Sequence, residues 1–543
     1  MKKLTMIGAV LALSLGVGAS QAAVFTVTST SDTDGTACGS LCTLRQAINA
    51  ANASVGADTI NFNLSGTITL GSILPVITDT LAIDGTGRSV TLSGGGAVQV
   101  LQVDSATTLA LNSFIIANGR STSVLTAGGV TVLPPSATNP TGGATLNITN
   151  CVFSDNSTVA SFAAGAIVLG TGNASLTVTD SGFTGNSGQS LNGDPTVGAI
   201  FSFSSGSMAI ASSTFENNSG STGAIQNSSG ALMVSGSTFA ANSATSLVGP
   251  GRGGAIVFNG GTGARGTITN STFYVNSAAS TGGAIYFINI GGVFSQLTVT
   301  NSTFSGNVSA AIAGNGGVVL GNSILEKNTS GSCSASVGDG GGNLSDDASC
   351  VFTTPTSLAN TPAQLGPLQK NGGPTRTMAP LIGSPAIDLG VNQLAIDSGL
   401  TTDQRGTGFP RISPAGGTVD RGAFEVQVDN IPPSCTATAM PKTLFDANHK
   451  LVQITTTVTA IDNNPGVTFK LRAVTSSEAD SGLGRGDLPG DIQGWIMGSA
   501  DLTGQLRNER FSRAGRTYSI TYEAKDVAGN VATCSATVTV PYR

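Results

Sequence analysis

Short alternations of hydrophobic and polar residues recur along the middle of the chain, and each is followed by a Phe-x-x-Asn motif. In Leu176-Thr177-Val178-Thr179, the alternation predicts a strand that buries Leu176 and Val178 and turns both threonines to solvent. In Asn301-Ser302-Thr303-Phe304, Phe304 lies two positions beyond Ser302, so both are expected to face the interior. The motif is present at Phe153, Phe183, Phe215, Phe239, Phe273 and Phe304, and Leu325 with Asn328 continues it with an aliphatic residue.

A second motif, Gly-Ala-Ile, stands between these copies. It occupies 165–167, 198–200, 223–225, 253–256 and 282–285, the last two with an additional glycine. Successive phenylalanines are 24 to 34 residues apart, which suits one coil of a solenoid. Stacked coils align the phenylalanines into an aromatic column and the asparagines into a ladder of bonded turns, while the glycines permit tight corners. The repeat predicts a right-handed parallel β-helix over residues 23–427.

Other repeat architectures fit the sequence less well. A leucine-rich horseshoe needs helix-forming segments and a denser leucine pattern, and a propeller needs longer blades of antiparallel hairpins. Helical repeats are excluded by the abundance of glycine, threonine and serine.

Residues 23–62 are predicted to cap the solenoid. Thr43 and Gln46 have the spacing of a capping box, which marks the start of a helix. The residues that share one face of this helix are Leu44, Ala47, Ile48 and Ala51. Because a solenoid must cover its open end, we expect the helix to pack over the first coil.

Residues 1–22 are predicted to be a signal peptide that is removed after Ala22. Lys2 and Lys3 precede a short apolar run, and Ser20 and Ala22 are the small residues that a signal peptidase reads. The run is too short for a membrane-spanning helix, and no transmembrane segment is predicted in the mature chain. An uncleaved N-terminal anchor is the alternative. We expect a secreted or extracellular protein, free or associated with the cell surface.

The composition agrees with many short strands joined by polar turns. Only 10% of the residues are charged, against about 25% in ordinary globular chains. The 74 glycines accompany 39% hydrophobic residues, too many for a disordered low-complexity chain. A net charge of −6 with scattered basic residues argues against nucleic acid as a partner.

The mature protein is expected to be a monomer.

The seven cysteines suit an oxidising destination. Their order along the chain predicts the disulfides Cys38–Cys42, Cys333–Cys350 and Cys435–Cys534, although other pairings are compatible with the sequence. Cys151 replaces the serine of the repeated Asn-Ser-Thr-Phe frame and is predicted to be a small buried side chain. Because His449 is the single histidine, no Cys-His metal site is predicted.

Three parts of the chain resemble exported bacterial β-helix proteins. Cys42-Thr43-Leu44-Arg45-Gln46-Ala47 resembles the CSLREA motif, and the repeats resemble those of chlamydial-type polymorphic outer-membrane proteins. Residues 361–427 are similar to the choice-of-anchor Q domain, with Gly383-Ser384-Pro385-Ala386-Ile387-Asp388, Asp403-Gln404-Arg405-Gly406 and Asp420-Arg421-Gly422-Ala423-Phe424-Glu425. The resemblance implies a surface-exposed or secreted protein whose molecular role is undefined.

Residues 431–543 are predicted to form a separate immunoglobulin-like β-sandwich of about seven strands. The composition shifts toward charge after Pro432-Pro433, and alternating runs such as 452–458 and 518–522 indicate strands. The stretches 448–452 and 526–530 resemble bacterial immunoglobulin-like modules. The whole protein is therefore expected to be all-β, apart from the capping helix.

No catalytic site is predicted. Polysaccharide lyases and hydrolases on this fold need clustered acids, with calcium and a basic residue in lyases of the pectate type. Between residues 100 and 330 there is no histidine, and no two acids recur at one strand position in adjacent coils. The acids of this region are Asp104, Asp155, Asp180, Asp194, Glu216 and Glu326.

Two acidic groups outside that region are candidate sites. Near the end of the solenoid, Asp388, Asp403 and Arg405 are candidate ligand-binding residues; the alternative is a turn-rich final coil in which acids pair with Arg405. In the last domain, a Gly-rich loop carries four candidate calcium ligands without the spacing of a known calcium loop: Glu478, Asp480, Asp487 and Asp491. No other cofactor is predicted.

The neutral polar exterior and the scarcity of acids favour a non-enzymatic protein, adhesin-like or glycan-binding, whose partners are glycans or other cell-surface molecules. One alternative is a polysaccharide lyase or glycoside hydrolase that acts at the end of the solenoid through Asp388 or Asp403. The other is a structural component of the cell envelope.

Overall fold

The computed structural model describes residues 22–137, 139–189, 192–245, 250–260, 264–289, 295–334, 336–413, 416–427, 429, 431–462 and 466–542. The predicted signal peptide lies outside these residues, except for Ala22. The chain divides into two compact units, residues 1–427 and 428–543, which are described separately. Within the described residues, no helix is both long and apolar enough to cross a membrane.

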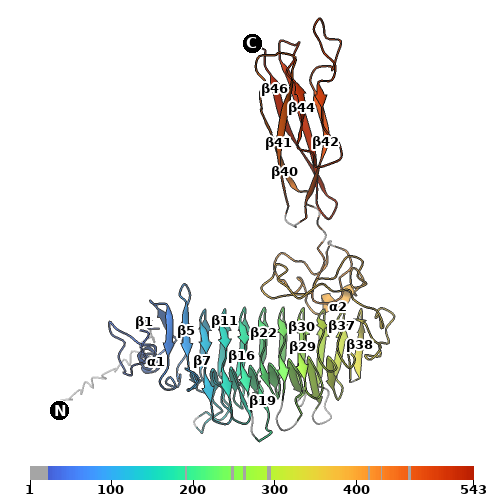
Figure 1. Ribbon diagram of the computed structural model, residues 1–543. Coiled ribbons are helices and arrows are strands. Elements are labelled where there is room, and N and C mark those ends of the chain that lie inside the picture. The colour runs from blue at the N-terminus through green and yellow to red at the C-terminus, as the bar shows by residue number, and fades with distance from the viewer. Residues whose placement is uncertain are drawn as a thin grey trace, which may run out of the picture. The chain divides into compact units, whose positions relative to one another are not determined.

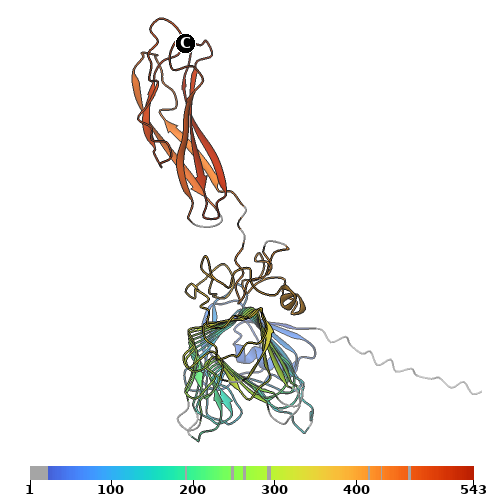
Figure 2. The same cartoon turned by 90° about the vertical axis from the view of Figure 1, so that its right-hand side faces the viewer.

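The first unit is a right-handed parallel β-helix, as the repeats predicted (Figure 1). Each complete coil contributes one strand to each of three long parallel sheets, and the coils superpose when viewed along the solenoid (Figure 2). The twelve-stranded sheet contains β1 (Val24–Val27), β2 (Asp58–Phe62), β4 (Leu81–Asp84), β7 (Thr108–Asn112), β11 (Thr145–Thr149), β16 (Ser175–Thr179), β21 (Met208–Ala211), β25 (Leu232–Ser235), β29 (Arg265–Thr269), β33 (Gln296–Thr300), β36 (Val318–Gly321) and β38 (Val337–Gly341).

The two other long sheets follow in each coil. The eleven-stranded sheet contains β3 (Gly66–Thr69), β5 (Val90–Ser93), β8 (Ile115–Ala117), β12 (Val152–Ser154), β17 (Gly182–Thr184), β22 (Thr214–Glu216), β26 (Thr238–Ala240), β30 (Thr272–Tyr274), β34 (Thr303–Ser305), β37 (Ile324–Glu326) and β39 (Leu344–Ser345). The eight-stranded sheet contains β6 (Leu101–Val103), β10 (Val130–Val132), β15 (Ile167–Leu169), β20 (Ile200–Ser202), β24 (Ile225–Asn227), β28 (Ile256–Gly260), β32 (Ile285–Asn289) and β35 (Ile312–Gly314).

Short strands fill the corner between the eleven- and eight-stranded sheets. Six of them form one sheet: β9 (Arg120–Ser121), β13 (Ser157–Thr158), β18 (Ser187–Gly188), β23 (Ser219–Gly220), β27 (Ser243–Ala244) and β31 (Ser277–Ala278). A further pair is β14 (Ala163–Ala164) with β19 (Thr196–Val197). Glycine is required here, because a Cβ at Gly198 would lie 2.0 Å from the carbonyl oxygen of Gly223 in the next coil.

The predicted aromatic column is confirmed. The buried rings of Phe153, Phe183, Phe215, Phe239, Phe273 and Phe304 stack with centroids 4.6 to 4.9 Å apart and planes within 7° of parallel. This spacing matches the distance between hydrogen-bonded strands, so the rings follow the backbone from coil to coil. They fill the interior beneath the eleven-stranded sheet.

The predicted asparagine ladder is also confirmed, and it is fully buried in the middle coils. Asn242 Oδ1 accepts bonds from the backbone N–H and the side-chain amide of Asn218, at 3.1 and 2.9 Å. The amide of Asn218 also donates to the carbonyl of Phe183 at 2.9 Å. The same pattern links Asn156 to Asn328. Because each buried amide finds its partners only in this register, the ladder opposes slippage of one coil against the next.

A serine ladder runs beside it. The hydroxyl of Ser237 accepts the N–H of Ser213 and donates to the carbonyl of Ser235. Cys151 occupies the corresponding position, and it is free and buried as predicted. Burial raises the pKa of its thiol, which keeps it neutral and unreactive.

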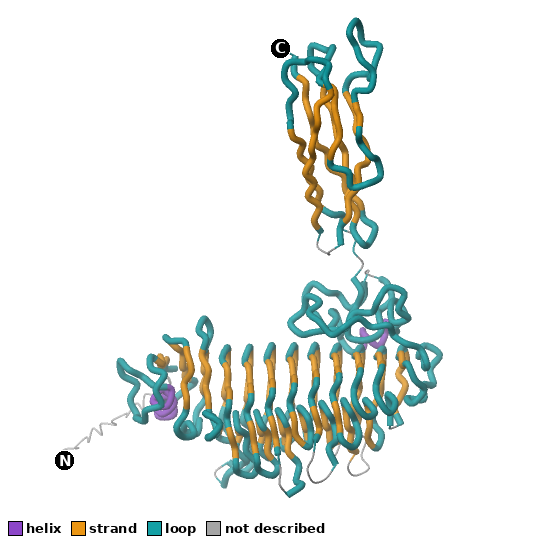
Figure 3. Tube along the Cα trace, viewed as in Figure 1, coloured by secondary structure: helices purple, strands orange, loops and turns teal. Residues whose placement is uncertain are grey.

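The start of the solenoid is capped as predicted by α1 (Leu44–Ala53), shown in purple in Figure 3. Thr43 and Gln46 form both bonds of a capping box, and Leu44, Ala47, Ile48 and Ala51 are the predicted residues that it buries. Arg45 pairs with Asp32 at 2.9 Å and donates to the carbonyls of Ser72 and Ile73. The predicted Cys38–Cys42 disulfide lies just before the helix.

Residues 361–427 differ from the expected final coil. They carry one short helix, α2 (Asn392–Asp397), and fold back over the outer face of the eleven-stranded sheet (Figure 1). We call them the docked segment. Their contacts reach from Glu216 on β22, bonded to Arg376, to Asn322, bonded to Val391. The outward orientation predicted for Thr177 is confirmed. The docked segment buries Thr300, on the same sheet, to 3% exposure.

The loop after β38 closes the last coil around one carboxylate. Asp339 accepts bonds from the backbone of Thr353 and Thr354 and from the side chains of Asn343, Thr354 and Ser357, at 2.6 to 2.9 Å. Burial opposes ionisation, but these donors outweigh it and lower the pKa of Asp339 to about 2. The predicted Cys333–Cys350 disulfide ties the same loop to the solenoid.

The second unit is an antiparallel β-sandwich of seven described strands, as predicted. One sheet contains β40 (Ser434–Met440), β41 (Leu451–Ile461), β44 (Thr503–Arg507) and β43 (Ile492–Gln493). The other contains β42 (Thr468–Ser476), β45 (Arg516–Lys525) and β46 (Val531–Val540). The predicted disulfide between Cys435 and Cys534 joins the first strand to the last. The buried core includes Ile454, Leu471 and Tyr522.

Replacing Phe239 by alanine should lower the free energy of unfolding by about 3–5 kcal/mol, because it opens a cavity between two stacked rings. Met233→Ala is the matched control, since Met233 belongs to the same coil but is 47% exposed. Urea unfolding of residues 23–543 measures both values. Similar losses for the two variants would contradict the inward position of Phe239.

Asp339→Asn should lower the free energy of unfolding at pH 7 by about 1 kcal/mol, after allowance for the screening of a partly exposed carboxylate. The folded-state pKa of Asp339 is lower than the unfolded value, so its contribution is present above pH 4 and is lost as the pH falls toward 2. The difference between wild type and variant should therefore vanish over that interval in urea unfolding series. A difference that is constant with pH would refute this role.

Candidate functional site

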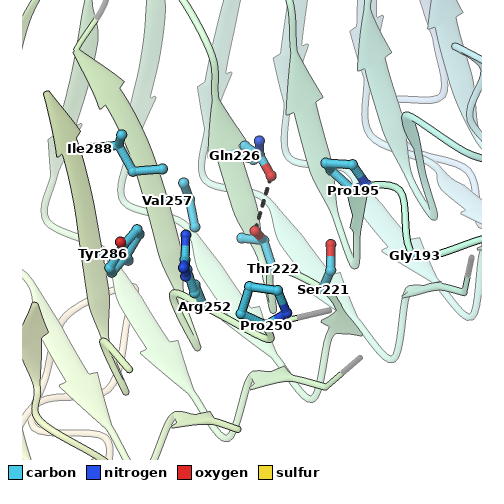
Figure 4. Close-up of a pocket in the computed structure, with 10 residues that line it drawn as sticks. All are labelled: Gly193, Pro195, Ser221, Thr222, Gln226, Pro250, Arg252, Val257, Tyr286 and Ile288. Carbon is cyan, nitrogen blue, oxygen red and sulfur yellow. Dashed lines mark hydrogen bonds between the residues drawn. The ribbon is translucent and has the colours of Figure 1, made fainter. Parts of the chain in front are cut away.

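A groove crosses the outer face of the eight-stranded sheet where long loops leave the corner strands. Its described lining is contributed by four successive coils (Figure 4). Gln226 lies on β24, Val257 on β28, and Tyr286 and Ile288 on β32. The corner loops supply Gly193, Pro195, Ser221, Thr222, Pro250 and Arg252. We call this the Arg252 groove; its volume is about 170 Å³.

The register of the parallel strands places the side chains of the groove in line. Gln226, Val257 and Tyr286 are direct partners across three neighbouring strands, so their outward side chains form one row. This row is a column of the same kind as those inside the solenoid, but its members differ. An amide, an apolar group and a phenol therefore succeed one another along the groove, at steps of ~4.8 Å.

Arg252 is held over the aromatic ring of Tyr286, with its guanidinium carbon 5.0 Å from the ring centroid. Its backbone N–H donates to the carbonyl of Ser221 at 3.1 Å. The Thr222 hydroxyl is bonded to the Gln226 side-chain carbonyl at 3.1 Å, and the Ser221 hydroxyl donates to the carbonyl of Thr196. These contacts fix the polar groups before any ligand arrives, which reduces the entropy lost on binding.

Arg252 is not neutralised by any acid in the described part of the chain. None of the ion pairs there involves it, and its buried Nε atom lacks a hydrogen-bond partner among those residues. The sequence segments 190–191, 246–249 and 290–294, which flank the lining residues, contain no ionisable side chain. Asp194 stands between the lining residues Gly193 and Pro195 in the sequence, but it is not itself among the lining residues. No ion pair in the described part of the chain therefore offsets the charge of Arg252.

The described lining of the Arg252 groove suits binding better than catalysis. General acid–base chemistry needs a carboxylate, an imidazole or another titratable group placed to move a proton. The described lining contains one arginine, which remains charged, and one tyrosine, but no acid and no histidine. Hydroxyls, an amide and apolar surface beside a guanidinium are groups that could bind a polar ligand with an anionic group.

The candidate residues Asp403 and Arg405 are brought together as a buried ion pair at 2.6 Å. Asp403 also accepts the backbone N–H groups of Arg405 and Glu425. The guanidinium of Arg405 lies between the rings of Phe409 and Phe424, 3.9 and 3.7 Å from their centroids. This pair organises the docked segment, in agreement with the alternative interpretation. Asp388 is exposed and does not take part in it.

Two further acids of the docked segment lie next to Arg411. Glu425 bonds to Arg411 at 2.7 Å, and Asp420 accepts the N–H groups of Asp388 and Val426. Burial raises the pKa of Glu425 to about 7 and that of Asp420 to about 6, against the lowering influence of Arg411. Both are almost inaccessible to solvent, so they contribute to the stability of the fold rather than to a ligand site.

The four candidate calcium ligands are distributed around two arginines. Asp491 pairs with Arg507 and Arg516, and Glu478 pairs with Arg516 at 3.0 Å. Asp480 accepts backbone N–H groups of Gly490 and Asp491, and Asp487 accepts that of Leu483. These bonds already occupy oxygens that calcium would need. Calcium binding at these residues stays a prediction.

A different acidic group in the second unit was not identified from the sequence. Carboxylate oxygens of Asp429, Asp462 and Asp526 lie within 4.8 Å of one another. Asp526 also accepts the backbone N–H groups of Gly529 and Asn530. The three acids come from the start of the unit and from two separate loops, so their spacing along the chain follows no motif.

The comparisons add little to this description. No family model matches the chain, and no curated protein matches it. A solved structure, that of Jun a 1, the major allergen from cedar pollen, is 14% identical and aligns with a TM-score of 0.24, over 55% of this chain and 70% of the allergen. A likeness of that size carries no argument about function.

Arg405→Ala should lower the free energy of unfolding by about 3–5 kcal/mol, because it leaves the carboxylate of Asp403 buried without its cation. Lys370→Ala, at an exposed position of the docked segment, should change it by less than about 0.5 kcal/mol. Urea unfolding gives both values, and proteolysis within residues 361–427 should accelerate in Arg405→Ala alone. Equal behaviour of the two variants would show that the ion pair does not hold the segment.

Proposed function

We propose that the protein is an exported, non-enzymatic, adhesin-like β-helix protein that binds acidic glycans in the Arg252 groove. The observation that carries the proposal is the guanidinium of Arg252, which makes no ion pair in the described part of the chain and lies against Tyr286 beside hydroxyl and amide groups. Glycans with carboxylate or sulfate substituents combine an anionic group with many hydroxyls, which matches this set of donors and acceptors.

Export is part of the proposal. The sequence begins with a predicted signal peptide, and three disulfides are typical of oxidising compartments. The motif-level resemblance to CSLREA-type, polymorphic outer-membrane and choice-of-anchor Q proteins points to the same destination. A glycan-binding solenoid at the cell surface would act in attachment to other cells or to an extracellular matrix.

The enzymatic alternative is less favoured by the described residues. The acids expected to act at the end of the solenoid do not form a catalytic pair. The carboxylate oxygens of Asp403 already bind the side chain of Arg405 and the backbone N–H groups of Arg405 and Glu425. Glu425 is bonded to Arg411 and buried. A role as a structural envelope component stays compatible with the solenoid, but it gives no reason for a half-buried arginine that makes no ion pair among the described residues.

Arg252→Gln should weaken binding to acidic glycans at least tenfold, because a charge-assisted pair with a carboxylate or sulfate is worth about 1.5–3 kcal/mol. Arg265→Gln is the control, since Arg265 is exposed on β29 outside the groove. Titration calorimetry with polygalacturonate, alginate and heparin oligosaccharides, and with neutral dextran oligosaccharides, measures the preference.

Two results would contradict the proposal. One is equal binding of acidic and neutral oligosaccharides that is unaffected by Arg252→Gln. The other is the appearance of new reducing ends or unsaturated products during incubation, which would mean that the protein cleaves the glycan.

A further inference from the structure

A second column of residues, on a different face of the solenoid, indicates a site for a polypeptide. In eight successive coils one residue turns the chain from the twelve-stranded to the eleven-stranded sheet, with a positive φ of 45° to 61°. We call these residues the corner column: Ser113, Asn150, Asp180, Ser212, Gly236, Asn270, Asn301 and Asn322. Left-handed backbone favours Asn, Asp and Gly, and seven of the eight residues carry a polar side chain.

The C-terminal half of the corner column binds the main chain of the docked segment. The side-chain amide of Asn270 donates to the carbonyl of Thr402 at 2.7 Å, and that of Asn301 donates to the carbonyl of Asp420 at 3.1 Å. Asn322 makes two bonds with the backbone of Val391, at 2.8 and 3.0 Å.

Side chains next to the column complete this recognition. The hydroxyl of Thr238 donates to the carbonyl of Arg376, and that of Thr272 donates to the side chain of Gln404, both at 2.6 Å. Arg376 of the docked segment also pairs with Glu216 on β22 at 2.7 Å. The solenoid thus binds the docked segment, which lacks the repeat, through the backbone groups of that segment and the cationic side chain of Arg376.

The N-terminal half of the column has the same geometry but is open. Asn150 and Asp180 are exposed, whereas Asn301 and Asn322 are fully buried by the docked segment. Two hollows lie along this half, one from Thr86 to Val152 and one from Asn150 to Pro374. They share Asn150 and so adjoin there, and we call the two hollows together the corner groove. It ends against Pro374 of the docked segment.

We propose that the corner groove binds an extended polypeptide segment of another protein. The groove continues an interface that already holds polypeptide. Its column offers hydroxyls, the carboxylate of Asp180 and the amide of Asn150, which donates to Ser113 at 3.1 Å. Val152, 39% exposed, offers an apolar surface, and the exposed Asp180 attracts a cationic side chain, as Glu216 does with Arg376. Three coil steps from Ser113 to Ser212 span ~14 Å, the length of about four extended residues.

This inference is independent of the glycan proposal, because the two grooves have no described lining residue in common. The probe is a set of overlapping 12-residue synthetic peptides that tile residues 361–427, the polypeptide for which the column is already shaped. Fluorescence anisotropy measures their binding to the mature chain. We expect the peptides that contain Arg376 to bind, and binding to weaken as the salt concentration rises.

Two variants locate the site. Val152→Asp should weaken peptide binding at least tenfold and Asp180→Lys at least fivefold. Met233→Asp, an exposed apolar position on β25 outside the groove, should leave the affinity unchanged. Glycan binding should be the same in all three variants, so a failure at one groove is distinguishable from a failure at the other.

Three outcomes would overturn the inference. The first is that no peptide of the set binds, or that Val152→Asp binds as wild type does. The second is self-association of the mature chain that Val152→Asp abolishes, which would assign the groove to a second copy. The third is displacement of bound peptide by soluble acidic oligosaccharides.

Discussion

Each coil of the solenoid rests on the previous one through parallel strands in register, and this alignment decides which side chains meet along the whole first unit. Because the step between coils is the strand spacing, a side chain faces the equivalent residue of the next coil rather than a random neighbour. Flat rings then stack, as Phe215 does on Phe239 at 4.8 Å, and amides bond in series, as Asn218 does with Asn242. Side chains of equivalent residues therefore form columns both in the interior and on the surface of the solenoid.

The two proposed sites follow from breaks in these columns. Inside the solenoid the phenylalanine and asparagine columns keep one residue type through the middle coils. On the outer face of the eight-stranded sheet, Gln226, Val257 and Tyr286 replace one another in successive coils, and long corner loops place Arg252 against the last of them. At the corner column the residues are similar from end to end, but only the C-terminal half is covered. Function is therefore expected where a column changes in composition or in exposure.

Much of the fold could be predicted from the sequence because its contacts repeat at a fixed spacing. The column of Phe153 and its successors, the capping box at Thr43 and the position of Cys151 depend on a motif and its register alone. The path of the docked segment could not be predicted in this way, since Gln404 meets Thr238 across 166 residues of chain with no repeated pattern. The groove was missed for the same reason: Arg252 and Tyr286 belong to different coils, and neither stands in a motif. Of the acidic candidates, the ion pair of Asp403 with Arg405 was foreseen as the alternative, because the two residues are adjacent in one turn.

The docked segment also restricts how the solenoid can change its length during evolution. It is fastened at points from Glu216 to Asn322, so a coil inserted between those points would separate partners that must stay a fixed number of steps apart. A coil inserted or deleted before β21 would leave every one of these fastenings intact. Duplication and loss of repeats should therefore be tolerated in the N-terminal half and selected against in the C-terminal half, which behaves as a module of constant size.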